Sequence, residues 1–278
     1  MNENRFFKGW AKPGPEVPGD LATLEGESLD SISGHFRLFQ LENGHRFSTD
    51  DLLVAWYGTS WAPCPAKVLD LGSGVGSVGM IAAWRLPGSS FVTVEAQEQS
   101  VQLARKSAQY NGLLSRYEIR RGDFRDSKIL ADDERFDLIL GSPPYFPLGS
   151  GIESDHPQKV ACRFEVRGDI SDYCRVASAH LNWGGLFACV FPITPEEQGR
   201  RVERTAHESG LSIIRRRPII FREGEPPLLS VFAMSRADHL PPVFRDRTWD
   251  EPALTIRCRD GSVHPEYQAV KLAIGFPP

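Results

Sequence analysis

The fold is decided by the stretch Asp70-Leu71-Gly72-Ser73-Gly74-Val75-Gly76, which joins a short apolar run to a helical segment. Residues 67–71 are mostly apolar and predict a buried strand, whereas the spacing of apolar residues over 78–85 predicts a helix. Glycines at such a junction let the backbone turn tightly and approach a ligand closely. The stretch therefore predicts a ligand-binding loop after the first strand of an α/β sheet.

Strand-like and helical segments alternate after this loop, which predicts parallel strands with helices on both faces. The last two strands are separated only by a short turn, so they should pair antiparallel at one edge. We therefore expect a Rossmann-like α/β fold with a seven-stranded, mostly parallel sheet and an antiparallel edge hairpin. Strands are predicted at residues 67–71, 90–95, 117–121, 136–141, 186–191, 211–221 and 228–235, and helices at 78–85, 99–111, 169–181 and 195–209.

Two flanking regions complete the predicted organisation. Residues 1–30 are rich in glycine and proline and predict a loosely docked arm, and residues 241–278 predict a largely polar tail. Between them, residues 31–240 form the main domain. Its first part, 31–60, should hold a hairpin that turns at Glu42-Asn43-Gly44 and a helix over 50–61 capped by Ser48 or Thr49.

The composition excludes several classes of protein. The chain has 278 residues with 41% apolar content, enough for a full core, and it has no apolar run long enough to cross a membrane. Its five cysteines are widely spaced without a CxxC pair, and the start lacks the apolar segment of a secretory signal. These features indicate a reducing, cytoplasmic location with no disulfide framework and no metal site. The net charge of −4 is not that of a general nucleic-acid binder, although a local basic patch could serve.

The acid before the glycines separates two possible cofactors. Asp70 would repel a pyrophosphate but suits the ammonium group of a methionine moiety, and the glycine spacing is shorter than that of dinucleotide-binding loops. This favours S-adenosylmethionine over a nicotinamide dinucleotide. Glu95, at the end of the second strand, could accept from ribose hydroxyls, or it could be a charge at a helix start. Asp123 could accept from the adenine amine beside Phe124, or it could be a turn acid.

A second motif, Ser142-Pro143-Pro144-Tyr145, follows the fourth strand. Ligands bind at the carboxyl ends of strands in such sheets. The prolines hold the backbone rigid, so the Pro143 carbonyl and the Ser142 hydroxyl could both accept from an exocyclic amine. Tyr145 could stack on a base, which would have to be single-stranded or flipped out. The alternative is a proline-stiffened turn with a core tyrosine.

This motif resembles the (Asn/Asp/Ser)-Pro-Pro-(Tyr/Phe/Trp) sequence of amino-group methyltransferases. The glycine loop precedes the Pro-Pro motif, as in adenine-N6 and release-factor glutamine methyltransferases, whereas many cytosine-N4 DNA enzymes have the reverse order. A closer resemblance lies in Phe47-Ser48-Thr49-Asp50-Asp51-Leu52-Leu53, which is similar to a segment of bacterial tRNA-Val anticodon-loop adenine-N6 methyltransferases. Residues 149–163 also resemble the polar loop of that family, and the likeness spans about 36–236.

The resemblance implies a class I methyltransferase fold and assigns roles by position. Catalytic roles fall on Ser142, Pro143, Pro144 and Tyr145. Cofactor contacts fall on Asp50, Asp70, Gly72, Ser73, Gly74, Gly76, Glu95, Ala96, Asp123, Phe124 and Ser142. Substrate contacts fall on Tyr145, Phe146, Lys159, Arg163 and Arg167. The family has Asn at the position of Ser142, so a hydroxyl replaces an amide acceptor here.

The substrate expected from these features is adenine N6 in a tRNA-like RNA. A protein glutamine amide is an equally planar acceptor, so glutamine methylation is the second hypothesis. The third is a catalytically silent methyltransferase fold that serves as a partner protein, which the intact Asp70, Glu95 and Ser142 argue against. Arginines can bind phosphate bidentately. Those at 200, 201 and 204 could equally form a solvated face, and those at 215, 216 and 217 alternate between the faces of a strand. His156 could contact substrate or solvent.

Overall fold

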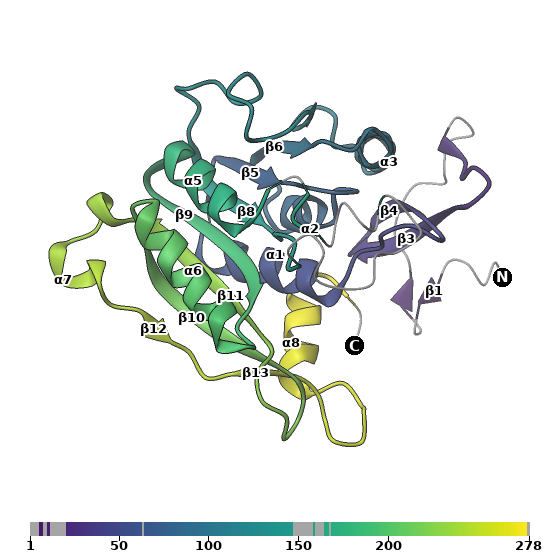
Figure 1. The fold of residues 1–278 in the computed structure, drawn as a ribbon. Coiled ribbons are helices and arrows are strands. Elements are labelled where there is room, and N and C mark those ends of the chain that lie inside the picture. The colour runs from purple at the N-terminus through teal and green to yellow at the C-terminus, as the bar shows by residue number, and fades with distance from the viewer. Residues whose placement is uncertain are drawn as a thin grey trace.

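A computed structural model describes residues 6–7, 10–11, 21–62, 64–146, 158, 164–166 and 168–276 (Figure 1). In this part of the chain, nine strands form one sheet in the order β12-β10-β11-β9-β8-β5-β6-β7, with β13 also paired to β10. The strands are β5 (Lys67–Leu71), β6 (Ser90–Glu95), β7 (Tyr117–Arg121), β8 (Phe136–Gly141), β9 (Leu181–Pro192), β10 (Leu211–Arg222), β11 (Leu229–Arg236), β12 (Trp249–Asp250) and β13 (Leu254–Arg257).

Helices cover both faces of this sheet, as Figure 1 shows. The helices are α1 (Thr49–Trp61), α2 (Ser77–Arg85), α3 (Glu98–Tyr110), α5 (Ile170–His180), α6 (Glu196–Glu208), α7 (Pro242–Arg245) and α8 (Pro265–Ala273), with a 3-10 turn at Ala237–His239. Alternate residues of a strand point to opposite faces. In β8, Leu138 and Leu140 therefore pack into the core beneath α1 and α2, while Ile139 packs into the core beneath α5.

The strand order changes direction at β5, and this places the site. Strand β5 pairs in parallel with β6 on one side and with β8 on the other. The chain segments that leave β5 and β8 therefore diverge at a shared sheet edge, and this crevice is where open α/β sheets bind ligands. Both sequence motifs, after Asp70 and after Gly141, lie at this edge. The predicted Rossmann-like architecture is confirmed.

The hairpin predicted at Glu42-Asn43-Gly44 is wrong. Strand β4 (Phe36–Leu41) pairs instead with the upstream β3 (Glu27–Ser33), and Gly34 in the connection has the left-handed φ of +50° that such a turn needs. Residues 42–48 lead from β4 into α1, with the Phe47 N–H donating to the Gln40 side chain at 2.7 Å. The two-residue strands β1 (Phe6–Phe7) and β2 (Trp10–Ala11) pair with each other and form a separate small sheet.

Residues after 240 add to the sheet, so the predicted count of seven strands is too low. Strands β12 and β13 pair in parallel with β10, which is therefore not an edge strand. Leu254 and Ile256 are buried and alternate with more exposed neighbours, a strand pattern too short to stand out in the sequence. The chain then returns to the N-terminal hairpin, where the Gly34 N–H donates to the Gly275 carbonyl at 2.9 Å.

The division of the chain at residues 30 and 240 stays a prediction, but the described residues pack across both positions. Strand β3 begins at Glu27, inside the expected arm, and Leu21 is buried. Strand β9 also begins at Leu181 rather than 186, because an irregularity in its pairing with β8 accommodates Gly184 and Gly185. Among the described residues, no helix has the length and apolar character needed to span a membrane.

Candidate functional site

A cavity of about 710 Å³ opens at the carboxyl ends of β5, β6 and β8. Its wall is formed by the segment before α1, the start of α1, the glycine loop, the end of β6, the turn after β7 and the Ser142–Tyr145 motif. Its volume falls within the usual range for small-molecule sites, roughly 300–1,000 Å³. The predicted cofactor and acceptor motifs therefore share one cavity.

The glycine loop takes backbone shapes that side chains would disturb. Gly72 has a φ of +61°, and a Cβ atom there would collide with the Tyr173 hydroxyl of α5. Gly74 and Gly76 also have positive φ, at 54° and 91°. The Ser73 hydroxyl is buried in the cavity wall without a hydrogen-bond partner in the described residues. A buried hydroxyl of this kind can be satisfied by a polar ligand.

Asp70 joins this loop to α2. One of its carboxyl oxygens, Oδ2, accepts from the Gly79 N–H at 2.9 Å, and only 1% of the residue is exposed. Burial raises the pKa of Asp70 well above its ordinary value, against the lowering effect of the Gly79 hydrogen bond, and the negative charges of Asp51 and Glu95 raise it further. A cation in the cavity would stabilise the ionised form.

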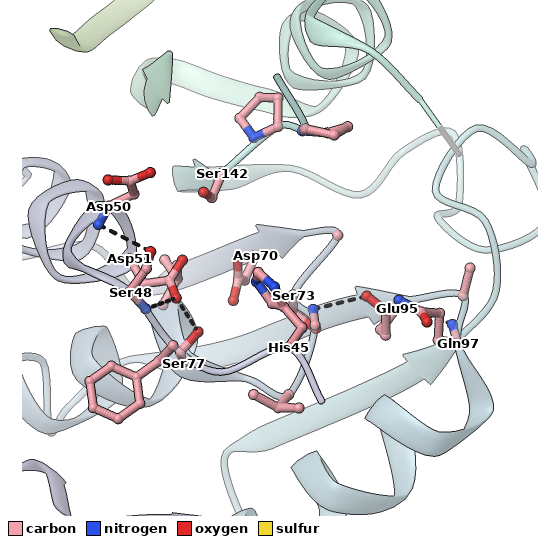
Figure 2. A pocket seen from close by; sticks show the side chains of 18 of the residues that line it. His45, Ser48, Asp50, Asp51, Asp70, Ser73, Ser77, Glu95, Gln97 and Ser142 are labelled. Atoms are coloured by element: carbon pink, nitrogen blue, oxygen red, sulfur yellow. Dashed lines mark hydrogen bonds between the residues drawn. The ribbon is translucent and has the colours of Figure 1, made fainter. Parts of the chain in front are cut away.

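Glu95 lies at the end of the cavity away from Ser142, as Figure 2 shows. Its Oε2 accepts from the Gly74 N–H at 2.9 Å, and its Oε1 accepts from the Gln97 N–H at 2.6 Å. Each carboxylate oxygen can accept more than one hydrogen bond. Glu95 can therefore hold the glycine loop and still accept from a ligand hydroxyl, and Ala96 lines the same wall.

The turn after β7 brings Asp123 and Phe124 to the same end of the cavity. Asp123 pairs with Arg125, with a shortest distance of 2.6 Å. Phe124 is buried and meets Tyr173 edge-to-face, with ring centroids 4.7 Å apart. Phe124 can therefore cover a flat ring, whereas Asp123 already has a charged partner.

The Ser142–Tyr145 motif forms the opposite wall. Tyr145 donates a hydrogen bond to Asp50 Oδ2 at 2.8 Å and packs edge-on against Phe191, with ring centroids 5.6 Å apart. Ser142, Pro143, Pro144 and Phe146 also line the cavity. The structure thus places Asp50, a predicted cofactor residue, against the predicted acceptor motif.

Two adjacent acids begin α1, and the second was missed by the sequence analysis. Asp51 completes a capping box with Ser48 and accepts from the Ser77 hydroxyl at 3.0 Å. Burial raises the pKa of Asp50 and the pKa of Asp51 to about 6 each, although hydrogen bonds from Tyr145 and Ser48 act in the opposite direction. The sequence Asp50-Asp51 could have indicated the role of the second acid. A helix N-cap needs only one such acid, so the other is available for a different role.

The predicted phosphate contacts Lys159, Arg163 and Arg167 lie outside the described residues, as does His156. Gln158, which is described, is buried and links the segment before α1 to α3, accepting from the His45 N–H at 2.9 Å and donating to the Ser100 hydroxyl at 3.1 Å. No motif in the sequence points to a role for Gln158. No group of three or more His, Cys, Asp or Glu side chains suited to a metal occurs in the described part of the chain.

Arginines elsewhere are largely engaged with acids. Arg200 pairs with Glu196, and Arg201 is held between Glu165 and Asp169. In β10, Arg215 pairs with Glu251, whereas Arg216 pairs with Glu203 and Asp250. These ion pairs favour the interpretation that the arginines of α6 and of β10 are surface and structural charges.

Comparisons with known proteins agree with this geometry. The methyltransferase small domain family matches residues 52–156. The chain is 26% identical over 239 residues to a "tRNA1(Val) (adenine(37)-N6)-methyltransferase" of Histophilus somni strain 129Pt, covering 84% of this chain and 92% of that protein. A protein of the same description from Porphyromonas gingivalis strain ATCC 33277 is 30% identical over 151 residues, covering 53% and 58%. One from Escherichia coli O157:H7 is 26% identical, covering 68% and 75%.

Among solved structures, a predicted O-methyltransferase from Agrobacterium tumefaciens superposes with a TM-score of 0.60 over 82% of this chain and 98% of that one, at 19% identity. The chain has a Rossmann-like methyltransferase fold. Its resemblance to the tRNA-Val adenine-N6 methyltransferases, inferred above from the motifs, is confirmed by the curated relatives. The methyltransferase fold here differs from the expected seven strands only by the added β12 and β13.

Proposed function

We propose that the chain transfers a methyl group from S-adenosylmethionine to the exocyclic N6 amine of an adenine in a tRNA-like RNA. The observation that carries the proposal is that an acid-lined cavity at the end of β5 and the Ser142–Tyr145 motif at the end of β8 face one another. The curated relatives, which carry the name tRNA1(Val) (adenine(37)-N6)-methyltransferase, favour RNA adenine as the acceptor. A cytoplasmic location is part of the same proposal.

The lining of the cavity fits S-adenosylmethionine. Asp50, Asp51, Asp70 and Glu95 line it, and burial leaves the first three with raised pKa values. Such a site favours a ligand with positive charge, because a nearby cation offsets the cost of ionising buried carboxyls. The Ser73 hydroxyl, which has no hydrogen-bond partner among the described residues, would add a polar contact. When bound, S-adenosylmethionine supplies a methyl group on a positively charged sulfur.

The acceptor side would work by positioning. The Ser142 hydroxyl and the Pro143 carbonyl can each accept a hydrogen from the amine, which would turn its lone pair toward the methyl group. Holding two reacting atoms in line converts a bimolecular reaction into an intramolecular one and removes much of the entropic barrier. Tyr145 would support the base from a side chain already fixed by Asp50 and Phe191.

Transfer assays with separated substrates test the proposal. The protein is incubated with methyl-labelled S-adenosylmethionine and, in separate reactions, with RNA, DNA and protein. We expect label in RNA alone. Label in the protein pool would instead support the second candidate, glutamine methylation, for which a planar amide fits the same two acceptors.

Glu95→Ala is expected to weaken S-adenosylmethionine binding by about tenfold or more. Loss of a hydrogen bond to a charged group costs roughly 1.5–3 kcal/mol, and each 1.4 kcal/mol is about tenfold in affinity. Calorimetric titration measures the effect. Glu98→Ala is the control, because Glu98 pairs with Arg121 on the exposed start of α3 and does not line the cavity. Equal affinities for the two variants would remove Glu95 from the cofactor site.

Replacing Lys159, Arg163 and Arg167 together by alanine should flatten the salt dependence of RNA binding. Each phosphate contact contributes about −0.7 to −0.9 to the slope of log affinity against log salt concentration, so three contacts contribute roughly −2. Cofactor affinity should not change. Arg200→Ala, which removes an exposed residue paired with Glu196, should leave the slope unchanged. If only Arg200→Ala alters the slope, the RNA lies along α6 instead.

A further inference from the structure

The acids that line the cavity differ in what they hold. Asp51, Asp70 and Glu95 each accept backbone N–H groups and thereby fix the loops around the cavity. Asp50 accepts no backbone N–H within the described part of the chain. Its Oδ2 accepts from the Tyr145 hydroxyl at 2.8 Å, and its Oδ1 accepts nothing from the described residues. Asp50 is therefore the acid in this group whose carboxyl holds no backbone loop in the described part of the chain and accepts instead from the acceptor motif.

Asp50 also lies on the acceptor side of the cavity. Figure 2 shows Asp50 and Ser142 on one side, Asp70 between, and Glu95 at the opposite end. The hydrogen bond from Tyr145 ties Asp50 directly to the last residue of the acceptor motif. A ligand amine held at Ser142 and Pro143 would lie on the same side as the Asp50 carboxyl group.

The acceptor motif itself lacks a good base. The amine must lose a proton on methylation, because a cation with the new methyl group and both original hydrogens is a strong acid. A serine hydroxyl and a proline carbonyl can accept hydrogen bonds but hold a proton only weakly. A carboxylate that lines the same cavity, such as Asp50, would supply what they lack, and general bases contribute about 10²–10⁴-fold to rate.

We infer that Asp50 is a catalytic residue that accepts the proton lost by the target amine. The inference rests on the proposed function. The nitrogen lone pair forms the new N–C bond, and the S–C bond breaks with its electron pair retained by sulfur. The N–H proton that was hydrogen-bonded to the Ser142 hydroxyl then passes to Asp50 Oδ1. The products are S-adenosylhomocysteine, the N-methylated base and a neutral Asp50, which returns its proton to water after product release.

The surroundings of Asp50 suit this role. Among the described residues, the titratable groups that face it are Asp51 on the same helix, Tyr145 from the segment after β8 and Tyr267 from α8. A helix start ordinarily stabilises a carboxylate, yet burial and the charge of Asp51 outweigh this and the Tyr145 hydrogen bond, raising the pKa of Asp50 to about 6. Near neutral pH the group is ionised and still a better base than an exposed aspartate.

The test is the single-turnover rate of methyl transfer to RNA, at saturating cofactor, between pH 5 and 8. In wild-type protein the rate should rise with pH and then level off, because ionised Asp50 is the active form. The midpoint should lie at or below the pKa of about 6 of the cofactor-free protein, since a bound cation stabilises the carboxylate. Asp50→Asn should be about 100-fold slower at pH 7.5 and should lose the rise. Retention of the rise in Asp50→Asn would overturn the inference. The inference would also be overturned if Asp50→Asn kept the wild-type rate at saturating cofactor and lost only cofactor affinity. Asp50 would then be a cofactor contact.

Two further variants separate catalysis from structure. Tyr145→Phe keeps the ring but removes the hydrogen bond that lowers the pKa of Asp50, so the rise should move to higher pH. Asp51→Asn should leave the rise in place, although the pKa of Asp51 is also about 6, because its carboxyl caps α1. Loss of the rise in Asp51→Asn alone would assign the proton to Asp51 and contradict the inference.

A measurement without turnover completes the test. Infrared difference spectra of the cofactor-free protein between pH 5 and 7 should contain the band of a carboxyl group that loses its proton in this range. The band should be absent in Asp50→Asn, and in Tyr145→Phe the carboxyl group should lose its proton at a higher pH. A band in Asp50→Asn identical to that of the wild-type protein would contradict the inference even if methyl transfer is impaired. If the wild-type protein transfers no methyl group to RNA, the proposed function is wrong. The inference about Asp50 is tested separately, by the differences between the wild-type protein and the variants.

Discussion

Asp70→Asn should bind S-adenosylmethionine at least about tenfold more weakly while unfolding at a higher temperature than wild-type protein at pH 8. The amide oxygen can still accept from the Gly79 N–H, and the amide N–H can donate to the hydroxyl of Tyr117, which is buried near Asp70. On the proposed function, what is lost is a negative charge that would face the ammonium group of the ligand, worth roughly 1.5–3 kcal/mol.

The gain in stability follows from the sign of the pKa shift. The pKa of Asp70 in the folded protein lies well above its ordinary value because the group is buried. The folded state therefore binds this proton more tightly than the unfolded state does, and stability falls as pH rises from about 4 through the folded pKa. Asp70→Asn removes that loss, so its unfolding temperature should depend less on pH.

Asp137→Asn is the matched control. Asp137 lies on β8, outside the cavity, and its carboxyl accepts from the Ala66 and Lys67 N–H groups and from the Asn182 amide. Although burial acts to raise it, these hydrogen bonds hold the pKa of Asp137 below its ordinary value. At pH 8 the substitution should lower stability and leave cofactor binding unchanged. Unchanged binding in Asp70→Asn as well would reduce Asp70 to a support for α2.

Ser142→Ala should slow single-turnover methyl transfer by about 100-fold without abolishing it. Removal of one preorganised hydrogen-bonding group typically costs about 10²–10³ in rate where charge develops. The Pro143 carbonyl remains as a second acceptor, so the lower end of this range is expected. The rate is measured at saturating cofactor, and calorimetry on the same variant measures any loss of cofactor affinity separately, because Ser142 also lines the cofactor cavity.

Two companion variants define the motif further. Ser142→Asn restores the residue of the resembled family, and we expect it to retain most of the rate because Ser142 borders an open cavity rather than a packed core. Tyr145→Ala removes a stacking surface, worth about 1–3 kcal/mol per base, and should raise the RNA concentration needed for half-maximal transfer by tenfold or more. Wild-type behaviour in both Ser142→Ala and Tyr145→Ala would exclude this motif as the active site.

The central sheet could be predicted from sequence because β6 and β8 are almost wholly buried and the edge strand β7 still lies between turn signals. Residues 90–95, 117–121 and 136–141 read as short runs between turn signals, and the structure has strands with these bounds. The helix N-cap at Ser48 was equally visible, because Ser and Asp residues before an apolar run satisfy the first backbone N–H groups. Local chemistry was sufficient in each case.

The errors arose where pairing depends on distant residues. Asn43-Gly44 has turn chemistry, yet β4 finds its partner in β3, which carries too few apolar residues to mark it as a strand. Strands β12 and β13 are held by pairing with β10, and nothing in their few residues identifies that partner.

The candidate site followed a similar division. The residues at strand ends, Asp70, Glu95 and Ser142, were found because parallel strands end at one edge of the sheet. The contact between Asp50 and Tyr145 joins residues 95 positions apart, so the sequence suggested Asp50 only through a family resemblance and gave no reason to place it beside the acceptor motif.

The most direct test of the central claim is nucleoside analysis of RNA after incubation with the wild-type protein and methyl-labelled S-adenosylmethionine. The RNA is digested to nucleosides, and the labelled product is identified by mass and chromatographic position. The proposed function predicts label in N6-methyladenosine, greatly reduced with Ser142→Ala. Label in a carbon- or oxygen-methylated nucleoside, or in protein glutamine with none in RNA, would contradict it.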